Sequence, residues 1–489
     1  MIFKTFFLEV IIVIDYLLFI NGSFRASAQG DGMQVINPAT EEPYATVACA
    51  SVEDVAEAVA AAKRAQPAWA KRPAIERGQA LRALAQSFRE HTEDLAKALT
   101  FEQGKVLSLA RGEVAAAANY LEFTAEWARR YEGEILQSDR PRENIFMFTM
   151  PVGVVAGILP WNYPLFLLVR KLAPALLTGN TIVIKPSEET PVNACIVGKL
   201  VQQVGIPRGV VNILAGGRDV GEALCSHPDV RMITFTGSVP TGKRIMAAAA
   251  SHVARVSLEL GGKAPSIVMD DADIALAVRC IRDSRMHNAG QVCNCAERVY
   301  VHRKRFDEFC TLLVQAMKQV RFGDPLDESM DYGPLINGTR RQAVAQLVQE
   351  AVHDGAELLT GGGYGPYPRG FYFEPTVLSN CTQDMRVVRE ETFGPVLPVV
   401  AFDDLDEALA LANDTEYGLT SSVFTQNLDT AMRVSNELQF GETYINREHS
   451  EAIQALHSGW KQSGIGGADG KHGLAEFIQR RVVYIQQQS

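Results

Sequence analysis

Three polar side chains, far apart in the chain, are of the types needed for acyl chemistry on a thiol. Cys293 directly follows Gly290-Gln291-Val292, and a thiol placed after such a turn is a candidate nucleophile. Glu259 lies on an apolar strand pattern that ends in two glycines, where its carboxylate can act as a general base. Asn162, in a Pro-Trp-Asn-Tyr-Pro segment, offers a side-chain amide that can stabilise an oxyanion. Together these residues predict a reaction that passes through a thioester.

The composition is that of a large acidic globular protein. The chain has 489 residues, 47% of them hydrophobic, and a formal net charge of -10, which is enough sequence for two or three domains. Lys and Arg residues are dispersed without a basic stripe, so we expect no nucleic-acid partner. The eight cysteines include no CxxC pair, which disfavours both a zinc site and a disulfide framework, and we expect no metal. Free thiols suit a reducing compartment, and we predict the cytoplasm.

The first residues leave two interpretations open. Residues 1–20 are largely apolar, and a short small-residue segment after them resembles a signal-peptide cleavage site. However, Glu9 and Asp15 interrupt the apolar run, so a clean span of about 20 residues is missing and we expect no membrane partner. We interpret residues 1–15 as an extension outside the folded domains, with a signal peptide as the alternative, and 18–23 as a strand and turn of the folded body.

Hydrophobic spacing predicts an α/β fold. Residues 52–130 have apolar side chains at helical spacing, and a strand–helix alternation begins at residue 152. The expected strands are 152–159, 181–184, 210–214, 232–235 and 255–260, with helices over 165–177, 192–204, 220–225 and 241–250 between them. Such alternation with short loops predicts a doubly wound parallel sheet. A second alternating block, from residue 264 to about 440, predicts a second such domain.

A glycine turn follows the strand at 232–235. The segment 237–243 nearly matches the phosphate loop GxxxxGK[ST], but Arg244 replaces the hydroxyl residue that would hold magnesium, which disfavours an NTPase. The favoured interpretation is a turn that opens a helix, whose first N–H groups can bind a pyrophosphate. No GxGxxG follows the first strand of the alternating block, so the usual dinucleotide fingerprint is absent. Ordinary turn glycines remain the alternative.

A second candidate ligand segment, Lys185-Pro186-Ser187-Glu188, follows the strand at 181–184 at its carboxyl end. Ligands bind at that edge in open α/β sheets. Lys185 and Glu188 can hold ribose hydroxyls, and a carboxylate there would repel a 2′-phosphate, which favours NAD over NADP. The alternative is a solvated loop in which Ser187 caps the next helix.

Taken together, these segments resemble the aldehyde dehydrogenase superfamily. The matching segments occur in family order and at family spacing, and the resemblance runs from about Leu18 to the C-terminus. They are 160–164, 185–188, 235–238, 258–263, 290–293 and 391–395. Within the superfamily the chain is most similar to the bacterial lactaldehyde and glycolaldehyde dehydrogenases, through 293–298, 442–448 and 464–473.

The resemblance implies a role for each matched residue. Cys293 would be the nucleophile, Glu259 the base that activates the deacylating water, and Asn162 the oxyanion donor. The residues implied for binding NAD are Lys185, Ser187, Glu188, Gly221, Phe235, Gly237, Ser238, Glu391 and Phe393. The expected reaction is the NAD-dependent oxidation of an aldehyde to its carboxylic acid through a thioester.

The resemblance also implies a division of the chain. Residues 16–130 and 152–261 would form the NAD-binding domain and 262–455 the catalytic domain. Residues 131–151 and 470–489 would form a small strand extension for oligomerisation. The apolar segment 482–485 has no obvious strand partner in the sequence, and an unpaired strand needs one, which we expect on another subunit of a homotetramer.

Arg170, Glu451 and His457 predict the substrate. In relatives that oxidise apolar aldehydes, the matching positions are commonly aromatic. Arg170 lies eight residues after Asn162 and four after Phe166, so all three should share one helix face that leads to the oxyanion donor. Polar groups at these positions suit a short hydroxyaldehyde, because burying them unpaired against an alkyl chain is costly. The alternative is that Arg170 and Glu451 simply pair with each other.

Several other interpretations remain. A semialdehyde dehydrogenase, for instance for succinate semialdehyde, would use Arg170 to bind a distal carboxylate. An acylating enzyme would pass the thioester to coenzyme A, but such relatives usually lack the carboxylate that matches Glu259. A non-catalytic structural protein on this scaffold would not need Cys293 and Asn162 intact. We expect Cys295 to be a bystander thiol, because no further ligands cluster near it in the sequence.

Overall fold

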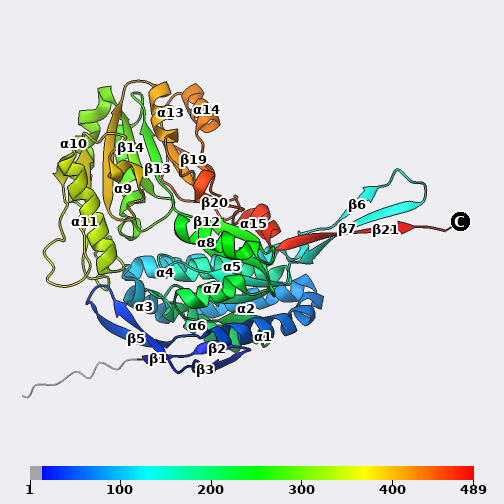
Figure 1. The fold of residues 1–489 in the computed structure, drawn as a ribbon. Helices are drawn as coiled ribbons and strands as arrows, with labels where there is room; N and C mark the ends of the chain where they lie inside the picture. The colour runs from blue at the N-terminus through cyan, green and yellow to red at the C-terminus, as the bar shows by residue number, and fades with distance from the viewer. Residues whose placement is uncertain (1–13, 489) are drawn as a thin grey trace, which may run out of the picture.

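The chain folds into two α/β lobes and a projecting arm of strands (Figure 1). The computed structural model describes residues 14–488. The lower lobe in Figure 1 contains the N-terminal half of the chain, and the upper lobe contains most of the second half. The C-terminal segment returns from the upper lobe to the lower lobe and ends in the arm. Within the described residues, no helix combines the length and the apolarity needed to span a membrane.

An eight-stranded sheet forms the centre of the lower lobe, in the order β20-β12-β11-β8-β9-β10-β2-β3. Its strands are β2 (Leu18–Ile20), β3 (Ser23–Arg25), β8 (Val154–Ile158), β9 (Thr181–Lys185), β10 (Val211–Ile213), β11 (Val230–Thr236), β12 (Arg255–Glu259) and β20 (Gly464–Ile465). The five strands from β12 to β10 are parallel, whereas β20, β2 and β3 pair antiparallel at the two edges. Every residue of β8 and β9 is buried, as expected for parallel strands covered on both faces.

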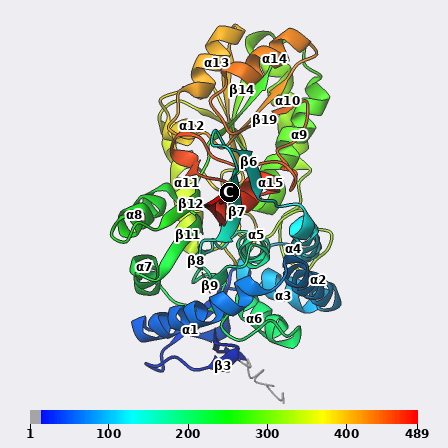
Figure 2. The ribbon, with the colours of Figure 1, turned by 90° about the vertical axis from the view of Figure 1, so that its right-hand side faces the viewer.

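Eight helices of this half of the chain pack around the sheet (Figure 2). They are α1 (Val52–Lys71), α2 (Ala74–Glu90), α3 (Thr92–Gln103), α4 (Leu107–Glu126), α5 (Pro164–Leu177), α6 (Val192–Gln203), α7 (Arg218–Ser226) and α8 (Val239–Ala250). The predicted helical block at 52–130 and the predicted strand–helix alternation after residue 152 are both confirmed. The amphipathic spacing decided them, because each helix buries one apolar stripe against the sheet or a neighbouring helix.

A small sheet precedes α1. Its strands are β1 (Ile14–Tyr16), β4 (Gly32–Asn37) and β5 (Glu42–Ala48), in the order β1-β5-β4. β1 pairs in parallel with β5, so Ile14 and Asp15 belong to this sheet. We had expected these two residues to lie outside the domains. The two interpretations of the first residues, an extension or a signal peptide, otherwise fall on residues 1–13, outside the described part of the chain.

The upper lobe contains a seven-stranded sheet in the order β15-β16-β17-β14-β13-β18-β19. Its strands are β13 (Ala264–Val268), β14 (Ala296–His302), β15 (Glu357–Thr360), β16 (Thr376–Ser379), β17 (Val396–Phe402), β18 (Thr420–Phe424) and β19 (Glu442–Ile445). Its helices are α9 (Ile274–Met286), α10 (Phe306–Lys318), α11 (Gly338–His353), α12 (Arg386–Arg389), α13 (Leu405–Asn413) and α14 (Leu428–Glu437). All strands except β15 run parallel, so the predicted second doubly wound domain is confirmed in architecture.

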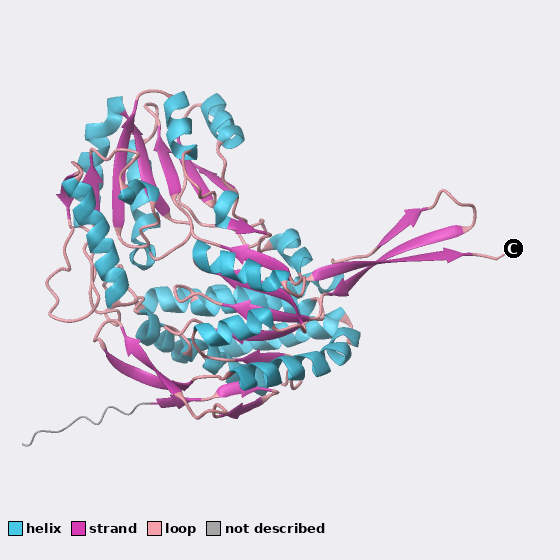
Figure 3. Cartoon of the chain, viewed as in Figure 1, coloured by secondary structure: helices cyan, strands magenta, loops and turns pink. Residues whose placement is uncertain are grey.

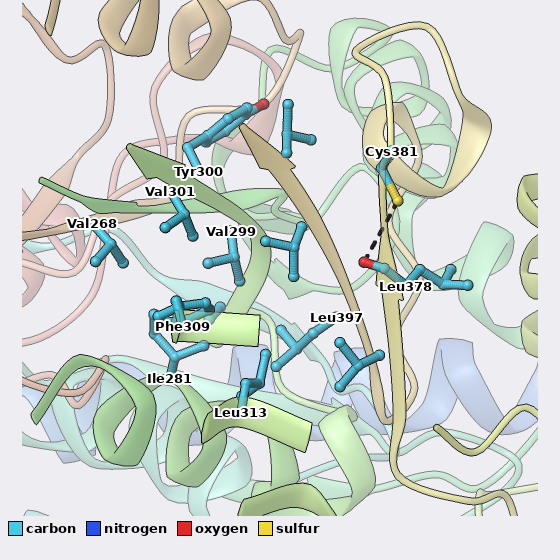
Figure 4. Packing of buried hydrophobic residues seen from close by; sticks show 14 of the residues in the cluster. Val268, Ile281, Val299, Tyr300, Val301, Phe309, Leu313, Leu378, Cys381 and Leu397 are labelled. Carbon is cyan, nitrogen blue, oxygen red and sulfur yellow. Dashed lines mark hydrogen bonds between the residues drawn. The ribbon is translucent and has the colours of Figure 1, made fainter. Parts of the chain in front are cut away.

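Part of the core of the upper lobe lies between its sheet and helices α9 and α10 (Figure 4). Val299 and Val301 of β14 point toward the aromatic ring of Phe309 and toward Ile281. Cys381, on the other side of the view, is a core thiol whose sulfur lies 3.7 Å from the carbonyl oxygen of Leu378. Close packing of this kind gives the lobe a rigid body on which the loops of the site are mounted.

Three strands form the arm that projects from the body (Figure 3). They are β6 (Glu134–Gln137), β7 (Glu143–Pro151) and β21 (Ile478–Gln486), in the order β21-β7-β6, and α15 (Gly470–Glu476) leads into β21. β21 pairs antiparallel with β7 over its whole length, from Ile478 opposite Pro151 to Gln486 opposite Glu143. The expectation that the terminal strand lacks a partner in its own chain is therefore wrong. The sequence did not show the pairing because the two strands are more than three hundred residues apart.

Candidate active site

Cys293 follows a turn with a strained backbone. Asn288, Ala289 and Gly290 have φ values of 50°, 58° and 72° in succession. This left-handed conformation costs a residue with a Cβ roughly 1–2 kcal/mol. A Cβ at Gly290 would also collide with the carbonyl oxygen of Gly394, so only glycine fits there. Backbone strain of this kind persists only where the surroundings hold it, and it is typical of functional sites.

Side-chain amides hold this turn against Asn162. The Gln291 amide donates to the carbonyl oxygen of Asn288 at 3.1 Å and accepts from the backbone N–H of Ile336 at 2.9 Å. The Asn162 amide donates to the carbonyl oxygen of Gln291 at 3.0 Å, and Asn288 donates back to the Asn162 carbonyl oxygen at 3.3 Å. The loop before Cys293 and the loop around Asn162 are therefore joined across the two lobes.

Asn162 lies before α5 and not on it. The helix begins at Pro164, so the predicted shared helix face includes Phe166 and Arg170 but excludes Asn162. The guanidinium carbon of Arg170 lies 5.3 Å from the centre of the Phe166 ring. A primary amide has two N–H donors, and Asn162 uses one of them on Gln291. The second is the donor that an oxyanion would use.

A buried ion pair that we did not predict positions Asn162. Lys105 contacts Glu113, neither side chain is exposed, and the Lys105 ammonium donates to the Asn162 carbonyl oxygen at 2.8 Å. Glu113 accepts from the backbone N–H groups of Leu165 and Phe166, at 2.9 and 3.0 Å, at the start of α5. The sequence did contain a signal, because Glu113 is a carboxylate on the otherwise apolar stripe of α4.

Glu259 is the last residue of β12 and is buried. Its carboxylate accepts a hydrogen bond from the Thr236 hydroxyl at 2.8 Å. Burial by itself raises the pKa of Glu259, but the nearby positive charges of Lys171, Arg170 and His457 outweigh it and lower this pKa to about 2. The carboxylate is therefore ionised at neutral pH.

Lys171 is a second buried group that the sequence analysis did not single out. Its ammonium donates to the Thr236 hydroxyl at 2.7 Å and to the Thr234 hydroxyl at 3.3 Å. Burial lowers the pKa of Lys171 to about 8, although the charge of Glu259 opposes that shift. Thr236 thus stands between an ammonium and the carboxylate of Glu259, and it fixes the distance between the two charges.

The two neighbouring thiols have different environments. Cys293 is partly exposed, whereas Cys295 is buried. The Cys295 thiol donates to the carbonyl oxygen of Val292 at 3.1 Å, and an Arg285 N–H lies 3.1 Å from its sulfur. Burial raises the pKa of the Cys295 thiol to about 11, so it is protonated at neutral pH. These features fit a bystander thiol beside a candidate nucleophile.

The predicted substrate residues come together, but through partners that we did not anticipate. Arg170 makes a two-pronged ion pair with Asp469, with one N–H to oxygen distance of 2.9 Å, and its guanidinium lies 3.5 Å from Glu451. Glu451 also accepts from the side-chain amide of Asn294. Arg170 and Asp469 are buried, whereas the side chain of Glu451 is 24% exposed. The alternative of a simple Arg170–Glu451 pair thus understates the network, because Asp469 is the principal partner of Arg170.

His457 completes this cluster. Its Nδ1 lies 2.5 Å from a carboxylate oxygen of Glu442. Burial and the charge of Arg170 lower the pKa of His457. The interactions with Cys293, Glu442 and Glu451 outweigh these two effects, so the pKa of His457 is raised well above its usual range. The Nδ1–H of His449, in contrast, donates to the Asn294 carbonyl oxygen at 2.7 Å, and burial lowers the pKa of His449 to about 4.

The predicted cofactor residues lie along the carboxyl edge of the lower sheet. Lys185 ends β9, and its ammonium lies 3.5 Å from Glu188, whose side chain is exposed. Ser187 does not cap a helix, because α6 begins only at Val192 and its preceding residue is Pro191. A Cβ at Gly221 would lie 3.6 Å from the Lys185 side chain, so α7 packs closely beside this lysine.

The turn Gly237-Ser238 opens α8, as predicted. Phe235, at the end of β11, packs its ring beneath Gly237, and Ser238 is the residue before the first helical position. The Ser238 hydroxyl donates to Thr241 and leaves the first N–H groups of the helix without a side-chain cap. Free N–H groups at a helix start suit a phosphate group, so these residues fit a dinucleotide.

Glu391 and Phe393 lie in the upper lobe, between α12 and β17. Glu391 accepts from the backbone N–H of Gly262 at 2.9 Å, and burial raises the pKa of Glu391 to about 7. The ring of Phe393 meets Trp161 edge to face with 5.3 Å between ring centres, and its φ of 49° is another strained value. Among residues 14–488, no three His, Cys, Asp or Glu side chains are grouped to hold a metal ion.

Comparison with protein families gives one match over most of the chain. The model described as "Aldehyde dehydrogenase family" matches residues 24–483. The lactaldehyde dehydrogenase of Escherichia coli (strain K12) is 52% identical over 476 residues, which cover 97% of this chain and 99% of that protein. The 3,6-anhydro-alpha-L-galactose dehydrogenase of Vibrio sp. (strain EJY3) is 44% identical over 474 residues, which cover 96% of this chain and 99% of that protein.

Solved structures agree with this result. The crystal structure of E. coli lactaldehyde dehydrogenase has a TM-score of 0.96 and 52% identity, and the match covers 97% of this chain and all of that one. A 3,6-anhydro-L-galactose dehydrogenase in complex with NAP has a TM-score of 0.95 and 44% identity, covering 96% and 100% of the two chains. A Staphylococcus aureus betaine aldehyde dehydrogenase in complex with NAD+ has a TM-score of 0.94 and 37% identity, covering 97% and 95%.

Proposed function

The chain belongs to the aldehyde dehydrogenase family, and on that premise we propose that it oxidises a short hydroxyaldehyde, lactaldehyde or glycolaldehyde, to its acid with NAD. It is an oxidoreductase, and the relative named for lactaldehyde is similar over nearly its full length. The observation that carries the substrate proposal is the charged cluster of Arg170, Glu451, Asp469 and His457, which contacts Asn294, the residue after Cys293. An alkyl chain packed against the partly exposed Glu451 would remove water from this carboxylate and offer it no hydrogen bond, at a free-energy cost that a substrate hydroxyl reduces.

Cys293 and Asn162 perform the first half of the reaction. The Cys293 thiolate attacks the aldehyde carbon, and the second N–H of Asn162 stabilises the oxyanion that forms. NAD, when bound, supplies the hydride acceptor. Lys185, Ser187, Glu188 and Gly221 would hold its adenosine half. Phe235, Gly237 and Ser238 would hold its phosphates beside the start of α8, and Glu391 and Phe393 would hold its nicotinamide half.

Glu259 performs the second half. Loss of hydride leaves an acyl group on the Cys293 sulfur as a thioester. Glu259, ionised because of Lys171 and Arg170, accepts a proton from a water molecule as that water attacks the thioester. The acid leaves and the Cys293 thiolate is restored. The buried Thr236 hydroxyl keeps the carboxylate in place between turnovers.

Rapid mixing with NAD and lactaldehyde should separate these roles. Glu259→Gln should give a burst of about one NADH per active site followed by slow turnover, because only hydrolysis is impaired. Cys293→Ala should give neither burst nor turnover while NAD still binds. Cys295→Ala, the matched control, should keep most of the activity. A missing burst in Glu259→Gln would assign Glu259 to thiol attack, and equal losses in the two cysteine variants would remove Cys293 as the sole nucleophile.

Glu451 is the member of the cluster that a substrate can reach. Its side chain is 24% exposed, whereas Arg170, Asp469 and His457 are buried behind it. We infer that Glu451 accepts a hydrogen bond from the substrate hydroxyl, while Arg170 and Asn294 hold the Glu451 carboxylate in place. A semialdehyde substrate is less well supported, because the guanidinium of Arg170 is already neutralised and Glu451 would repel a distal carboxylate.

Substrate comparison tests this inference. Wild type should favour lactaldehyde over propanal in kcat/KM by at least roughly tenfold, because without the hydroxyl the polar groups of the site stay unpaired. Glu451→Gln should reduce kcat/KM for lactaldehyde about fivefold, equivalent to about 1 kcal/mol, and leave that for propanal unchanged. Glu448→Gln, an exposed carboxylate nearby, is the control. If wild type oxidises propanal and lactaldehyde alike, the cluster does not recognise the hydroxyl.

We propose a preference for NAD over NADP on the basis of Glu188. Its exposed carboxylate stands at the end of β9, where the adenosine ribose should lie, and would repel a 2′-phosphate. Glu188→Ser should therefore raise kcat/KM with NADP relative to NAD, whereas Glu188→Asp, which keeps the charge, should not. Steady-state rates with both cofactors measure the ratio. Equal use of NAD and NADP by wild type would refute the electrostatic argument.

We also propose that the chain forms a homo-oligomer, a tetramer by the family resemblance, through the arm. The outer strands β6 and β21 each have an edge without a neighbour in the described sheet, and such edges attract further strands. Large apolar side chains of the arm are exposed, including Ile135, Phe148 and Tyr484. Patches of this kind are typical of subunit interfaces.

Truncation of the C-terminus tests the oligomer. A chain that ends at Arg480 loses most of β21 and should show a smaller mass, or aggregation, in light scattering, because the edge of β7 is then exposed. A chain that ends at Gln487 keeps β21 intact and serves as the control. An unchanged mass in the shorter chain would remove β21 from the interface.

A further inference from the structure

A buried carboxylate, that of Glu297, holds the loop that carries the two residues proposed to bind the nicotinamide half of NAD. Glu297 is the second residue of β14 and is 1% exposed. Its carboxylate accepts hydrogen bonds from the backbone N–H groups of Thr392 and Phe393, at 3.0 and 3.1 Å. Bonds to a charged acceptor are roughly twice as strong as neutral ones. Because Glu391 directly precedes Thr392, this carboxylate fixes the backbone between Glu391 and Phe393.

Two buried cations hold the Glu297 carboxylate in turn. The Lys263 ammonium lies 2.6 Å from one carboxylate oxygen, and the Arg285 guanidinium lies 2.6 Å from the other. Each oxygen therefore accepts from one cation and from one backbone N–H, which saturates the carboxylate. Burial by itself raises the pKa of Glu297, but the charges of Arg285 and Lys263 outweigh burial and lower this pKa to about 2. The carboxylate is thus ionised and held from four directions.

Lys263 adds a second connection to the same loop. Its ammonium also donates to the Thr392 hydroxyl at 3.1 Å, and both side chains are fully buried. The backbone N–H of Gly262, the residue before Lys263, donates to the Glu391 carboxylate at 2.9 Å. The segment 262–263 is therefore joined to the loop through a backbone contact and a side-chain contact, and the position of the Glu391 carboxylate depends on both.

Arg285 connects the Glu297 carboxylate to the backbone on both sides of the candidate nucleophile. After the nucleophile, the Arg285 guanidinium donates to the carbonyl oxygen of Ala296 at 3.2 Å. Before the nucleophile, a Cβ at Gly290 would lie 3.1 Å from the Arg285 Nε and would collide with the carbonyl oxygen of Gly394. The strained turn therefore packs between the guanidinium and the end of the loop that Glu297 holds.

We propose that Glu297 is a positioning residue that fixes the nicotinamide half of NAD relative to the sulfur of Cys293. It holds the loop 391–393 directly and, through Arg285, holds that loop against the turn before Cys293. Hydride transfer depends on this spacing, because a misplacement of about 1 Å can cost about 10²-fold in rate. The inference rests on the proposed function in one respect, that the loop contacts the nicotinamide half. The adenosine half, assigned to residues of the lower lobe, does not depend on this carboxylate.

Binding of NAD and of ADP to the full chain tests the proposal. NAD contains the nicotinamide half, whereas ADP lacks it and keeps the adenosine and its phosphates. Isothermal titration calorimetry gives both Kd values without any aldehyde, so the identity of the substrate does not affect the outcome. Glu297→Gln places an amide NH2 group where a carboxylate oxygen accepts from a cation and a backbone N–H. The variant should bind NAD about tenfold more weakly and bind ADP within about twofold of wild type.

Two further variants complete the test. Glu390→Gln is the matched control, because Glu390 is an exposed carboxylate of the same segment that pairs with Arg386, and it should leave both Kd values unchanged. Thr392→Val removes the hydroxyl that accepts from Lys263 and removes no charge. It should weaken NAD binding about threefold without affecting ADP, and it decides the test if Glu297→Gln does not fold.

The ratio of the two Kd values distinguishes positioning from general stability. A residue that only stabilised the fold would lower Tm when replaced and leave this ratio unchanged. Equal weakening of NAD and ADP in Glu297→Gln, or unchanged binding of NAD in a variant with wild-type circular dichroism, would overturn the proposal. A selective loss of NAD binding would support it, whichever aldehyde the enzyme prefers.

Discussion

The buried ion pair between Lys105 and Glu113 is the interaction on which the geometry of the site depends. Removing one partner of such a pair typically costs about 3–5 kcal/mol, because the other charge is left buried and unpaired. Lys105 binds the carbonyl oxygen of Asn162, and Glu113 binds the first free N–H groups of α5. That helix carries Arg170 and Lys171 into the site. One ion pair therefore positions both Asn162, the proposed oxyanion donor, and the helix that supplies positive charge to Glu259, the proposed base.

Some of the residues with a strained backbone lie where the two lobes meet. Asn288, Ala289, Phe393 and Asp469 all have positive φ values, and each borders a side chain that we assign to the reaction. Each such residue costs of order 1–3 kcal/mol, which the hydrogen bonds around it must offset. At Ala289 the offset comes from its neighbours, because Asn288 and Gln291 tie the turn to Asn162. Hydrogen bonds within the site thus hold the residues whose backbone is strained.

Sequence reasoning identified features that depend on one short segment and missed contacts between residues far apart in the chain. Cys293, Glu259 and the turn before α8 could be predicted because each lies in a short segment with its own turn or strand signal. Asp469 and Glu442 could not be assigned, although both lie in segments that had been singled out, because their partners are Arg170 and His457, and only the tertiary structure brings these pairs together. The start of α5 was predicted to within one residue, but Asn162 was wrongly assigned to its face, because Pro164, a favourable first helical residue, marks the start of the helix after Asn162. The pairing of β21 with β7 was missed because the hydrophobic pattern of a strand does not show which distant strand it pairs with.

The return of the chain from the upper lobe to the lower sheet limits how this site can change. β20 pairs with β12, with Gly464 opposite Glu259, so the segment that carries His457 is joined to the strand that carries the base. A Cβ at Gly464 would lie 2.5 Å from the carbonyl oxygen of Leu258, and one at Gly459 would meet the backbone of Ser463. An inserted residue in this segment would shift its pairing with β12 and move the His457 imidazole relative to the Glu259 carboxylate. We therefore expect changes of substrate at this segment to come from exchanged side chains on a backbone of fixed length. Insertions or deletions in the loop, a common route to new substrates in other enzymes, would disturb the pairing with β12.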